Sequence, residues 1–257
     1  MAFSPASFSL DGKKALVTGG ASGIGAAIAE GLAASGADVC VTFNRQPADA
    51  TLDAIAQSGR KGQALQCDLA ALDEAKAAAL VDAACEAVGG VDILINNAGI
   101  IRRAPALDHG LEDWRAVMST NLDAAFLLSQ AAGQIMAQAG GGKIVSTASV
   151  LSYQGGILVP GYAASKHALI GLTQALANEW AGQGINVNAI APGYTATDNT
   201  QALRDDPERS AALLNRIPAG RFAEPDEMVG AVVFLCSPAA SYVHGSVITI
   251  DGGWLSR

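Results

Sequence analysis

Histidine and cysteine, the residues that most often bind transition metals or form disulfides, are scarce in this 257-residue sequence, with three and four copies. The cysteines form no C-x-x-C pair, and neither set has the spacing of a zinc site. They stand at Cys40, Cys67, Cys85, Cys236, His109, His167 and His244. We therefore expect free thiols and no bound metal.

Charge is also in short supply, and basic charge above all. Only 16% of the residues are charged, and 16 Lys and Arg against 24 Asp and Glu leave a net charge of −8 at pH 7. A protein with this balance repels a phosphate backbone, so a nucleic-acid partner is not expected. Half of the residues are hydrophobic, which is enough for a large core and excludes a disordered chain.

Long apolar runs are missing as well. The longest, such as Val229–Cys236, fall far short of the ~20 residues that cross a bilayer. The opening residues Met1–Pro5 show neither the basic segment nor the apolar core of a secretory signal. We expect a cytoplasmic protein with no membrane partner.

What the sequence does contain is an alternation of short β-branched runs with Ala-rich helical segments. Strands are predicted at 15–18, 39–43, 64–67, 93–95, 143–147, 185–190 and 247–250. Helices are predicted at 24–35, 73–88, 112–138, 161–181 and 226–235. Most strands are apolar on both faces, which is typical of a parallel sheet covered by helices on both sides.

The expected fold is therefore α/β: a single doubly wound Rossmann domain over residues 1–257, with a seven-stranded, mostly parallel sheet and helices on both faces. One domain suits this length, because single α/β domains reach about 250 residues. The stretch 195–216 is polar and weakly patterned. We interpret it as an insertion or a lid on the substrate side.

A glycine-rich turn joins the first strand to the first helix. Its glycines let the backbone approach a pyrophosphate, whose charge the helix N-terminus stabilises. The candidate dinucleotide-binding residues here are Gly19, Ser22, Gly23, Ile24 and Gly25. An ordinary tight strand–helix turn is the alternative, and the position after the first strand favours the dinucleotide.

Further cofactor candidates follow the third and fourth strands. Asp68, beside Leu69, is placed to accept a hydrogen bond from an adenine amino group, although it could also simply cap a helix. Asn97, Ala98 and Gly99 would let a ribose lie against the strand ends, and an Asn-Gly type turn is the alternative.

The end of the second strand bears on cofactor choice, because NAD-specific proteins usually carry an acidic residue there. This sequence has Asn44 and Arg45 instead. An arginine can pair with a 2′-phosphate, so we expect NAD or NADP with a slight preference for NADP. A solvated loop arginine is the alternative.

A phenol and an ammonium group stand four residues apart at Tyr162 and Lys166, so one helix face would carry both. A nearby cation lowers the pKa of a phenol, which would make Tyr162 a usable acid and base. Ser149 follows the fifth strand and could bind the same substrate oxygen. Asn121 lies in a helical stretch, where it could bend the helix, hold a water or simply be solvated. A surface Tyr–Lys pair is the alternative.

Together these motifs resemble the short-chain dehydrogenase/reductase family over essentially the whole chain. They are Thr18-Gly19-x-x-x-Gly23-x-Gly25, Cys67-Asp68-Leu69, Asn96-Asn97-Ala98-Gly99, Asn121, Ser149, Tyr162-x-x-x-Lys166, Pro192-Gly193 and Asp251-Gly252-Gly253. The resemblance implies that Tyr162 is the acid/base and that Ser149 orients the substrate oxygen. It also implies that Lys166 lowers the tyrosine pKa and holds the nicotinamide ribose, while Asn121 carries a relay water.

The resemblance also has implications for the segment after the sixth strand and for the oligomeric state. Pro192, Gly193, Thr195 and Thr197 would face the nicotinamide carboxamide, and a plain Pro-Gly loop is the alternative. The family also implies a homo-oligomer, most simply a homotetramer. The apolar residues at 126–128 exceed what one sheet contact requires, although extra core burial would also explain them.

Within the family, the chain is most similar to members that act on sugar acids of the gluconate and 2-keto-3-deoxygluconate type. Arg102 and Arg103 follow the fourth strand at the ligand-binding edge, and a guanidinium suits a carboxylate. A solvated arginine or a salt bridge to Asp108 or Glu112 is the alternative. The expected substrate-binding residues are Arg102, Arg103, Ser149, Gln154 and Tyr162, with Tyr153 and Trp180 as further members of the pocket.

The expected activity is therefore an NAD(P)-dependent interconversion of a secondary alcohol and a ketone on a sugar acid. Reduction of a 3-oxoacyl thioester or another lipophilic ketone is one alternative, and a non-catalytic dinucleotide-binding regulator is another. Ser-His-Asp hydrolysis is disfavoured because no histidine joins the motifs. A metal-dependent alcohol dehydrogenase is disfavoured by the missing ligand sets.

Overall fold

A seven-stranded sheet in the order β3-β2-β1-β4-β5-β6-β7 organises the chain, and every neighbouring pair is parallel. The computed structural model describes residues 4–257, so Met1–Phe3, part of the segment examined for a secretory signal, lie outside it. The strands are β1 (Lys14–Val17), β2 (Asp38–Phe43), β3 (Gly62–Gln66), β4 (Ile93–Asn96), β5 (Gly142–Thr147), β6 (Ile185–Pro192) and β7 (Val247–Ile250). All seven predicted strands are confirmed.

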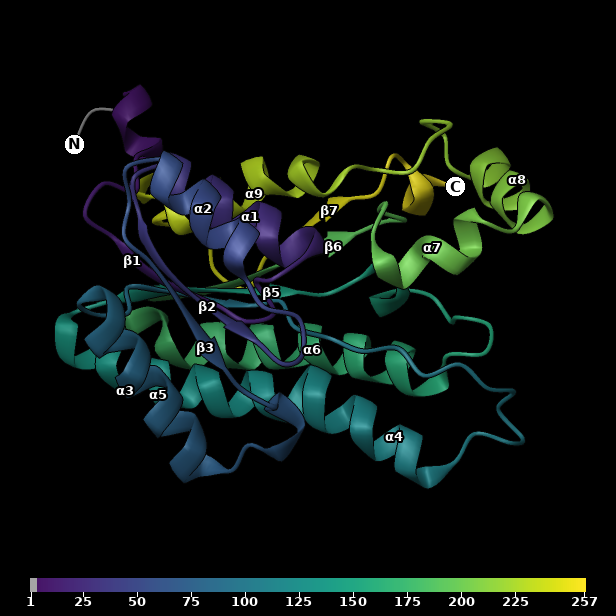
Figure 1. The fold of residues 1–257 in the computed structure, drawn as a ribbon, viewed down its shortest axis with the longest axis horizontal. Coiled ribbons are helices and arrows are strands. Elements are labelled where there is room, and N and C mark those ends of the chain that lie inside the picture. The colour runs from purple at the N-terminus through teal and green to yellow at the C-terminus, as the bar shows by residue number, and fades with distance from the viewer. Residues whose placement is uncertain (1–3) are drawn as a thin grey trace.

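Side chains along each strand alternate between two hydrophobic cores, because successive residues of a strand point to opposite faces. In β1, Ala15 and Val17 enter one core and Leu16 enters the other. Figure 1 shows the two helical layers that close these cores. One layer contains α1 (Gly23–Ala34), α2 (Asp49–Gln57) and α9 (Val229–Cys236). The other contains α3 (Glu74–Val88), α4 (Leu111–Met118), α5 (Ala124–Ala139) and α6 (Pro160–Trp180).

The helices differ from the sequence prediction in three places. The expected helix 112–138 is interrupted by a π-helical turn at Ser119–Asp123, which separates α4 from α5. Helix α2 was not expected, because only Thr51 and Ile55 of its residues are buried and its apolar pattern is weak. The segment expected at 226–235 begins with a 3-10 turn, Pro225–Met228, before α9.

The polar stretch 195–216 contains two helices that the sequence did not predict, α7 (Asp198–Arg204) and α8 (Pro207–Arg216). They lie together at one end of the molecule, beyond β6 and beside the C-terminus (Figure 1). A small third core of Val150, Leu213, Ile217 and Trp254 attaches α8 to the sheet.

Strand β1 lies between β2 and β4. The chain first adds β2 and β3 on one side of β1 and then adds β4 to β7 on the other side. Such a switch opens a crevice at the carboxyl ends of the strands, which is where doubly wound folds bind ligands. No helix within residues 4–257 is long and apolar enough to cross a membrane.

Candidate active site

The turn after β1 is built around glycines that no other residue could replace. Gly19 has a φ of +65°, in the left-handed region. A Cβ at position 25 would lie 2.1 Å from the carbonyl oxygen of Gly19. Helix α1 begins at Gly23, directly after Ser22, so its unpaired N–H groups open into the crevice. The turn therefore fits a pyrophosphate, as the sequence predicted.

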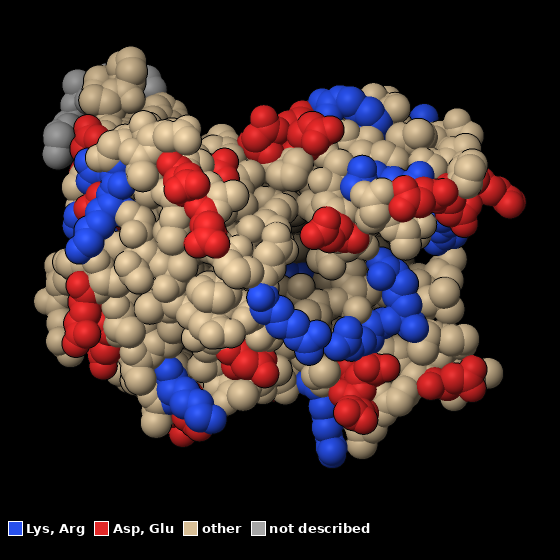
Figure 2. Space-filling model, in the orientation of Figure 1, with Lys and Arg blue, Asp and Glu red and all other residues tan. Residues whose placement is uncertain are grey.

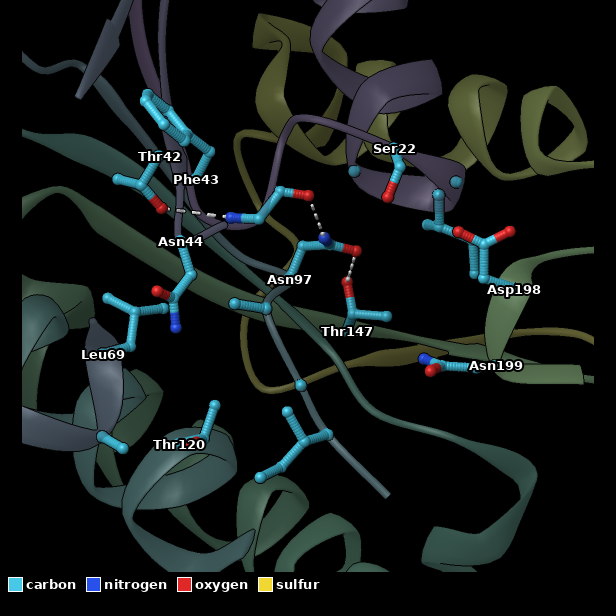
Figure 3. A pocket seen from close by; sticks show the side chains of 18 of the residues that line it. Ser22, Thr42, Phe43, Asn44, Leu69, Asn97, Thr120, Thr147, Asp198 and Asn199 are labelled. Atoms are coloured by element: carbon cyan, nitrogen blue, oxygen red, sulfur yellow. Dashed lines mark hydrogen bonds between the residues drawn. The ribbon is translucent and has the colours of Figure 1, made fainter. Parts of the chain in front are cut away.

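Hydrogen bonds from two neighbouring strands hold this turn in place. The Gly19 N–H donates to Thr42 Oγ1 at 3.1 Å. The Asn97 amide donates to the carbonyl oxygens of Thr18 at 3.0 Å and Gly19 at 3.3 Å, and accepts from Thr147 at 3.4 Å (Figure 3). Sequence reasoning missed the threonines, because a threonine at a strand end carries no signal of its own.

The crevice is a cleft of about 670 Å³ that most of the predicted cofactor residues line. Figure 3 shows Asn44 and Leu69 at one end and Asp198 and Asn199 at the other, and Figure 2 shows a hollow bordered by Lys and Arg side chains. The predicted residues in the lining are Gly19, Ser22, Gly23, Ile24, Gly25, Asn44, Arg45, Asp68, Leu69, Asn97, Ala98, Gly99, Tyr162, Lys166 and Thr197. Asp68 also accepts a hydrogen bond from the Ala70 N–H at 3.1 Å, so it caps a 3-10 turn as well.

Three predicted cofactor residues do not line the cleft. Pro192 is buried at the end of β6. A Cβ at Gly193 would lie 2.7 Å from the Cα of Asp251, so this glycine permits a close backbone approach. Thr195 is 2% exposed and its hydroxyl donates to the carbonyl oxygen of Gly193. After β6, the residues that line the cleft are instead Thr197, Asp198 and Asn199.

Tyr162 and Lys166 lie together on α6, and the alternative of a surface pair is wrong. The Lys166 ammonium is 5.6 Å from the centre of the Tyr162 ring. Lys166 is 3% exposed and donates to the carbonyl oxygen of Thr147. Ser149, also buried, is hydrogen-bonded to Tyr162 through its side chain. The end of β5 and the start of α6 thus converge at one point of the cleft.

The protonation of this group depends on burial. Burial raises the pKa of Tyr162, against the smaller opposing effects of the Ser149 hydrogen bond and the Arg103 charge. Burial also lowers the pKa of Lys166 to about 8. Both groups lose hydration in the same enclosed site, and the predicted effect of Lys166 on the tyrosine pKa stays a prediction.

Asn121 lies in the π-helical turn and is 2% exposed, so the alternative of a solvated asparagine is wrong. Its Oδ1 accepts from the Ile100 N–H at 2.8 Å, and its Nδ2 donates to the Ile100 carbonyl at 3.1 Å. The same Nδ2 donates to Ser165 on α6 at 3.1 Å. Asn121 thereby fixes the loop after β4 against the helix that carries Tyr162.

The two arginines after β4 have different partners. Arg102 forms an ion pair with Asp113 at 3.3 Å, rather than with either of the acids considered in the sequence. Arg103 Nη2 donates to the carbonyl oxygen of Asn199, on α7, at 3.0 Å. Its positive charge lowers the pKa of Tyr162, whereas Arg102 is the one of the two arginines that lines the cleft.

The remaining residues expected in the substrate pocket are Gln154, Tyr153 and Trp180. Gln154 Oε1 accepts from Arg216 at 3.1 Å and from the Trp254 indole at 2.9 Å. Tyr153 is 47% exposed. The expectation for Trp180 is wrong, because its ring packs against Gly133 in the core between the sheet and α5.

Comparison with known proteins gives matches over nearly the whole chain. A family model described as enoyl-(acyl carrier protein) reductase matches residues 19–255. The 2-dehydro-3-deoxy-D-gluconate 5-dehydrogenase of Bacillus subtilis (strain 168) is 50% identical over 252 residues, 97% of each chain. A structure assigned as an NAD(P)-dependent gluconate 5-dehydrogenase from Beutenbergia cavernae, with bound NADP, has a TM-score of 0.92 and 53% identity, covering 97% of this chain and 99% of that one.

A third relative carries a second bound molecule. The structure of a gluconate 5-dehydrogenase from Burkholderia cenocepacia, in complex with NADP and tartrate, has a TM-score of 0.92 and 39% identity, covering 97% of this chain and 98% of that one. The glycine turn, the Tyr162–Lys166 pair and these similarities agree with one another. The chain therefore belongs to the short-chain dehydrogenase/reductase family of NAD(P)-dependent oxidoreductases.

Proposed function

We propose that this protein is a dehydrogenase that interconverts a secondary alcohol and a ketone on a sugar acid of the gluconate or 2-keto-3-deoxygluconate type. The relatives most similar in sequence are named for such substrates. Tartrate, which one of the similar structures contains, is itself a hydroxylated carboxylic acid. The proposal depends above all on a positive charge beside Tyr162.

Arg103 supplies that charge. Its guanidinium lowers the pKa of Tyr162, against the effect of burial, so it acts at the reacting end of the cleft. Within residues 4–257, Nη2 is the only Arg103 atom with a hydrogen bond, to Asn199, which leaves other donors of the fork for a ligand. A guanidinium binds a carboxylate with two parallel hydrogen bonds. Arg102 lines the cleft, but its Nε is already paired with Asp113 at 3.3 Å. We assign carboxylate binding to Arg103.

Tyr162 is assigned as the general acid and base. In the oxidative direction its phenolate takes the proton of the substrate hydroxyl, and in the reductive direction its phenol returns it. Ser149, hydrogen-bonded to Tyr162, holds the substrate oxygen beside the phenol. Lys166 holds the ribose of the cofactor and adds positive charge near Tyr162, while Asn121 positions the loop after β4. A nicotinamide cofactor supplies the hydride acceptor or donor.

The cofactor preference that we propose is NADP over NAD. Arg45 lines the cleft at the end of β2, where an NAD-specific protein usually has an acid. It is exposed, and the described part of the chain shows no hydrogen-bond or ion-pair partner for it. A free guanidinium at this position suits a 2′-phosphate.

Two single variants test the assignment of Arg103. Arg103→Ala should raise KM for an aldonate about 10- to 100-fold, the effect of losing a hydrogen bond to a charged group. Turnover of a neutral polyol should change far less. Arg60→Ala, which removes an arginine that is paired with Asp38 outside the cleft lining, is the control and should leave both substrates close to wild type. Equal losses on both substrates, or turnover of 3-oxoacyl thioesters alone, would contradict the proposal.

We further propose that residues 195–216 form a substrate-side lid and that the protein acts as a homotetramer in the cytoplasm. Asn199 on α7 is bonded to Arg103, which supports a lid role. Phe126 and Trp114 are 41% and 36% exposed on α5 and α4, which supports an assembly surface. The four free cysteines suit a reducing compartment. Light scattering giving the mass of a single chain would contradict the tetramer.

A further inference from the structure

The side chain of Gln154 is fixed in one orientation. Its Oε1 accepts two hydrogen bonds, from Arg216 Nη2 at 3.1 Å and from Trp254 Nε1 at 2.9 Å. A guanidinium and an indole N–H can only donate, so the atom that they contact has to be the amide oxygen. The amide nitrogen, Nε2, must therefore point away from both of them.

Arg216 and Trp254, the two residues that donate to Gln154, are called the clamp from here on. The Arg216 guanidinium stacks over the Trp254 ring at 3.8 Å. Trp254 is 3% exposed, in the small core that also contains Val150. Arg257 Nη1 donates to the carbonyl oxygen of Asn215 at 3.2 Å, which holds the last turn of α8 against the C-terminal segment. Helix α8 and the segment after β7 thus meet on Gln154.

This clamp adjoins the catalytic group. Gln154 belongs to the segment that starts at Ser149, and Val150 in that segment packs in the same core as Trp254. The Tyr194 ring packs against the Trp254 ring, with 4.8 Å between the ring centres, and Tyr194 follows directly after the end of β6 at Pro192 and Gly193. Gln154 is therefore placed on the substrate side of the site rather than in the glycine-rich cradle.

The donor end of Gln154 is free. Within residues 4–257, Nε2 of Gln154 has no hydrogen-bond partner, and it is not one of the enclosed polar atoms that lack one. A glutamine normally loses rotamer freedom when it binds a ligand. Here the clamp has already removed that freedom, and two N–H donors are presented in a fixed direction.

We propose that Gln154 is a specificity-determining residue that donates from Nε2 to a hydroxyl or carboxylate oxygen of the substrate, and that Arg216 and Trp254 are the residues that position it. This proposal rests on the proposed sugar-acid activity. It assigns to this part of the site a preference for substrates with an acceptor oxygen, which a lipophilic ketone lacks away from its reacting carbonyl.

Gln154→Glu separates donation to the substrate from a purely structural role. A glutamate accepts the same two hydrogen bonds, strengthened by its charge, so the clamp persists. Its second oxygen replaces the donor with a negatively charged acceptor that repels a sugar acid. KM for an aldonate should rise about 10-fold or more, with kcat less affected, unchanged NADPH affinity and an unchanged or higher melting temperature. Gln63→Glu, on the exposed distal strand β3, is the matched charge control.

Trp254→Phe tests the positioning role, because it keeps an aromatic ring but removes the indole N–H. KM should rise about 3- to 10-fold in the wild-type background, an effect typical of one neutral hydrogen bond. In a Gln154→Ala background the same change should add nothing, because no amide remains to be positioned.

Three outcomes are distinguishable. A wild-type KM in Gln154→Glu would overturn the donor role, and an equal effect of Trp254→Phe in both backgrounds would overturn the positioning role. Failure of the wild-type protein to turn over any sugar acid would overturn the proposed function, and this inference with it. The expected result is a higher KM in Gln154→Glu and no further effect of Trp254→Phe in the Gln154→Ala background.

Discussion

The ammonium group of Lys166 donates to the carbonyl oxygen of Thr147 at 2.6 Å, which joins the N-terminal part of α6 to the last residue of β5. Lys166 is 3% exposed, and burial lowers its pKa to about 8 from an ordinary value of 10.5. A buried ammonium disfavours folding when it is charged, so the protein holds this group in the site at the expense of stability.

This loss of stability predicts that the free energy of unfolding depends on pH. Between about pH 8 and pH 10.5 the unfolded chain keeps the Lys166 proton while the folded protein loses it. The free energy of unfolding therefore rises with pH across this window through this group. Relative to Lys166→Met, the wild type should gain up to ~3 kcal/mol between the two ends of the window. Urea unfolding of both proteins measures this difference, and a difference independent of pH would contradict the prediction.

Replacing Tyr162 with phenylalanine removes the hydroxyl and keeps the ring beside Lys166. Turnover should fall about 10²- to 10⁴-fold, the usual contribution of a general acid or base. Cofactor affinity should stay nearly unchanged, because the pyrophosphate site is formed by the glycine turn after β1 and not by the phenol. Steady-state assays and NADPH titration check both parts. A variant with more than about a tenth of wild-type kcat would remove Tyr162 from this role.

The strands and the motifs could be predicted from sequence because each depends on local chemistry. β1 and β4 are short apolar runs, and the turn at Gly19 carries its own glycine signature. Helix α2 could not be found in this way, since only Thr51 and Ile55 face the core. Helix α8 was missed because it is polar on average and buries only Leu213.

Site residues could be predicted from sequence where the residue type itself implies a chemistry. They could not be predicted where the role of a residue depends on which side chain it contacts. Tyr162 and Lys166 were found from their spacing, yet their pKa values follow from burial that spacing does not reveal. The sequence treats Arg102 and Arg103 alike, whereas in the structure Arg102 pairs with Asp113 and the charge of Arg103 lowers the pKa of Tyr162. Such distinctions depend on which side chains the fold brings together.

The glycine turn gives a prediction about binding and stability together. Gly25→Ala would place a methyl 2.1 Å from the Gly19 carbonyl oxygen, so the turn must shift and the pyrophosphate site with it. NADPH affinity should fall at least about tenfold. The free energy of unfolding should fall by the ~1–3 kcal/mol typical of overpacking, which lowers the melting temperature. Gly230→Ala, in α9 with nothing within 4 Å, is the control and should be neutral or slightly stabilising.

The last prediction concerns the choice between NADP and NAD. Arg45 is exposed at the end of β2 and lines the cleft beside Asn44. If its guanidinium pairs with the 2′-phosphate, Arg45→Ala should weaken NADPH binding about 10-fold or more, as expected for a lost charge-assisted hydrogen bond, and leave NADH binding unchanged. Arg45→Glu should go further and reverse the preference, because a carboxylate accepts a hydrogen bond from the free 2′-hydroxyl and repels the phosphate.

Fluorescence titration of both reduced cofactors against the three proteins measures these affinities. Raising the salt concentration should weaken NADPH binding to the wild type more than NADH binding, because the guanidinium lies in solvent, where its charge is screened. Arg60→Ala, an arginine paired with Asp38 away from the cleft, is the control for general loss of positive charge. Tighter binding of NADH than NADPH by the wild type, or equal effects of Arg45→Ala on both, would show that Arg45 is merely solvated.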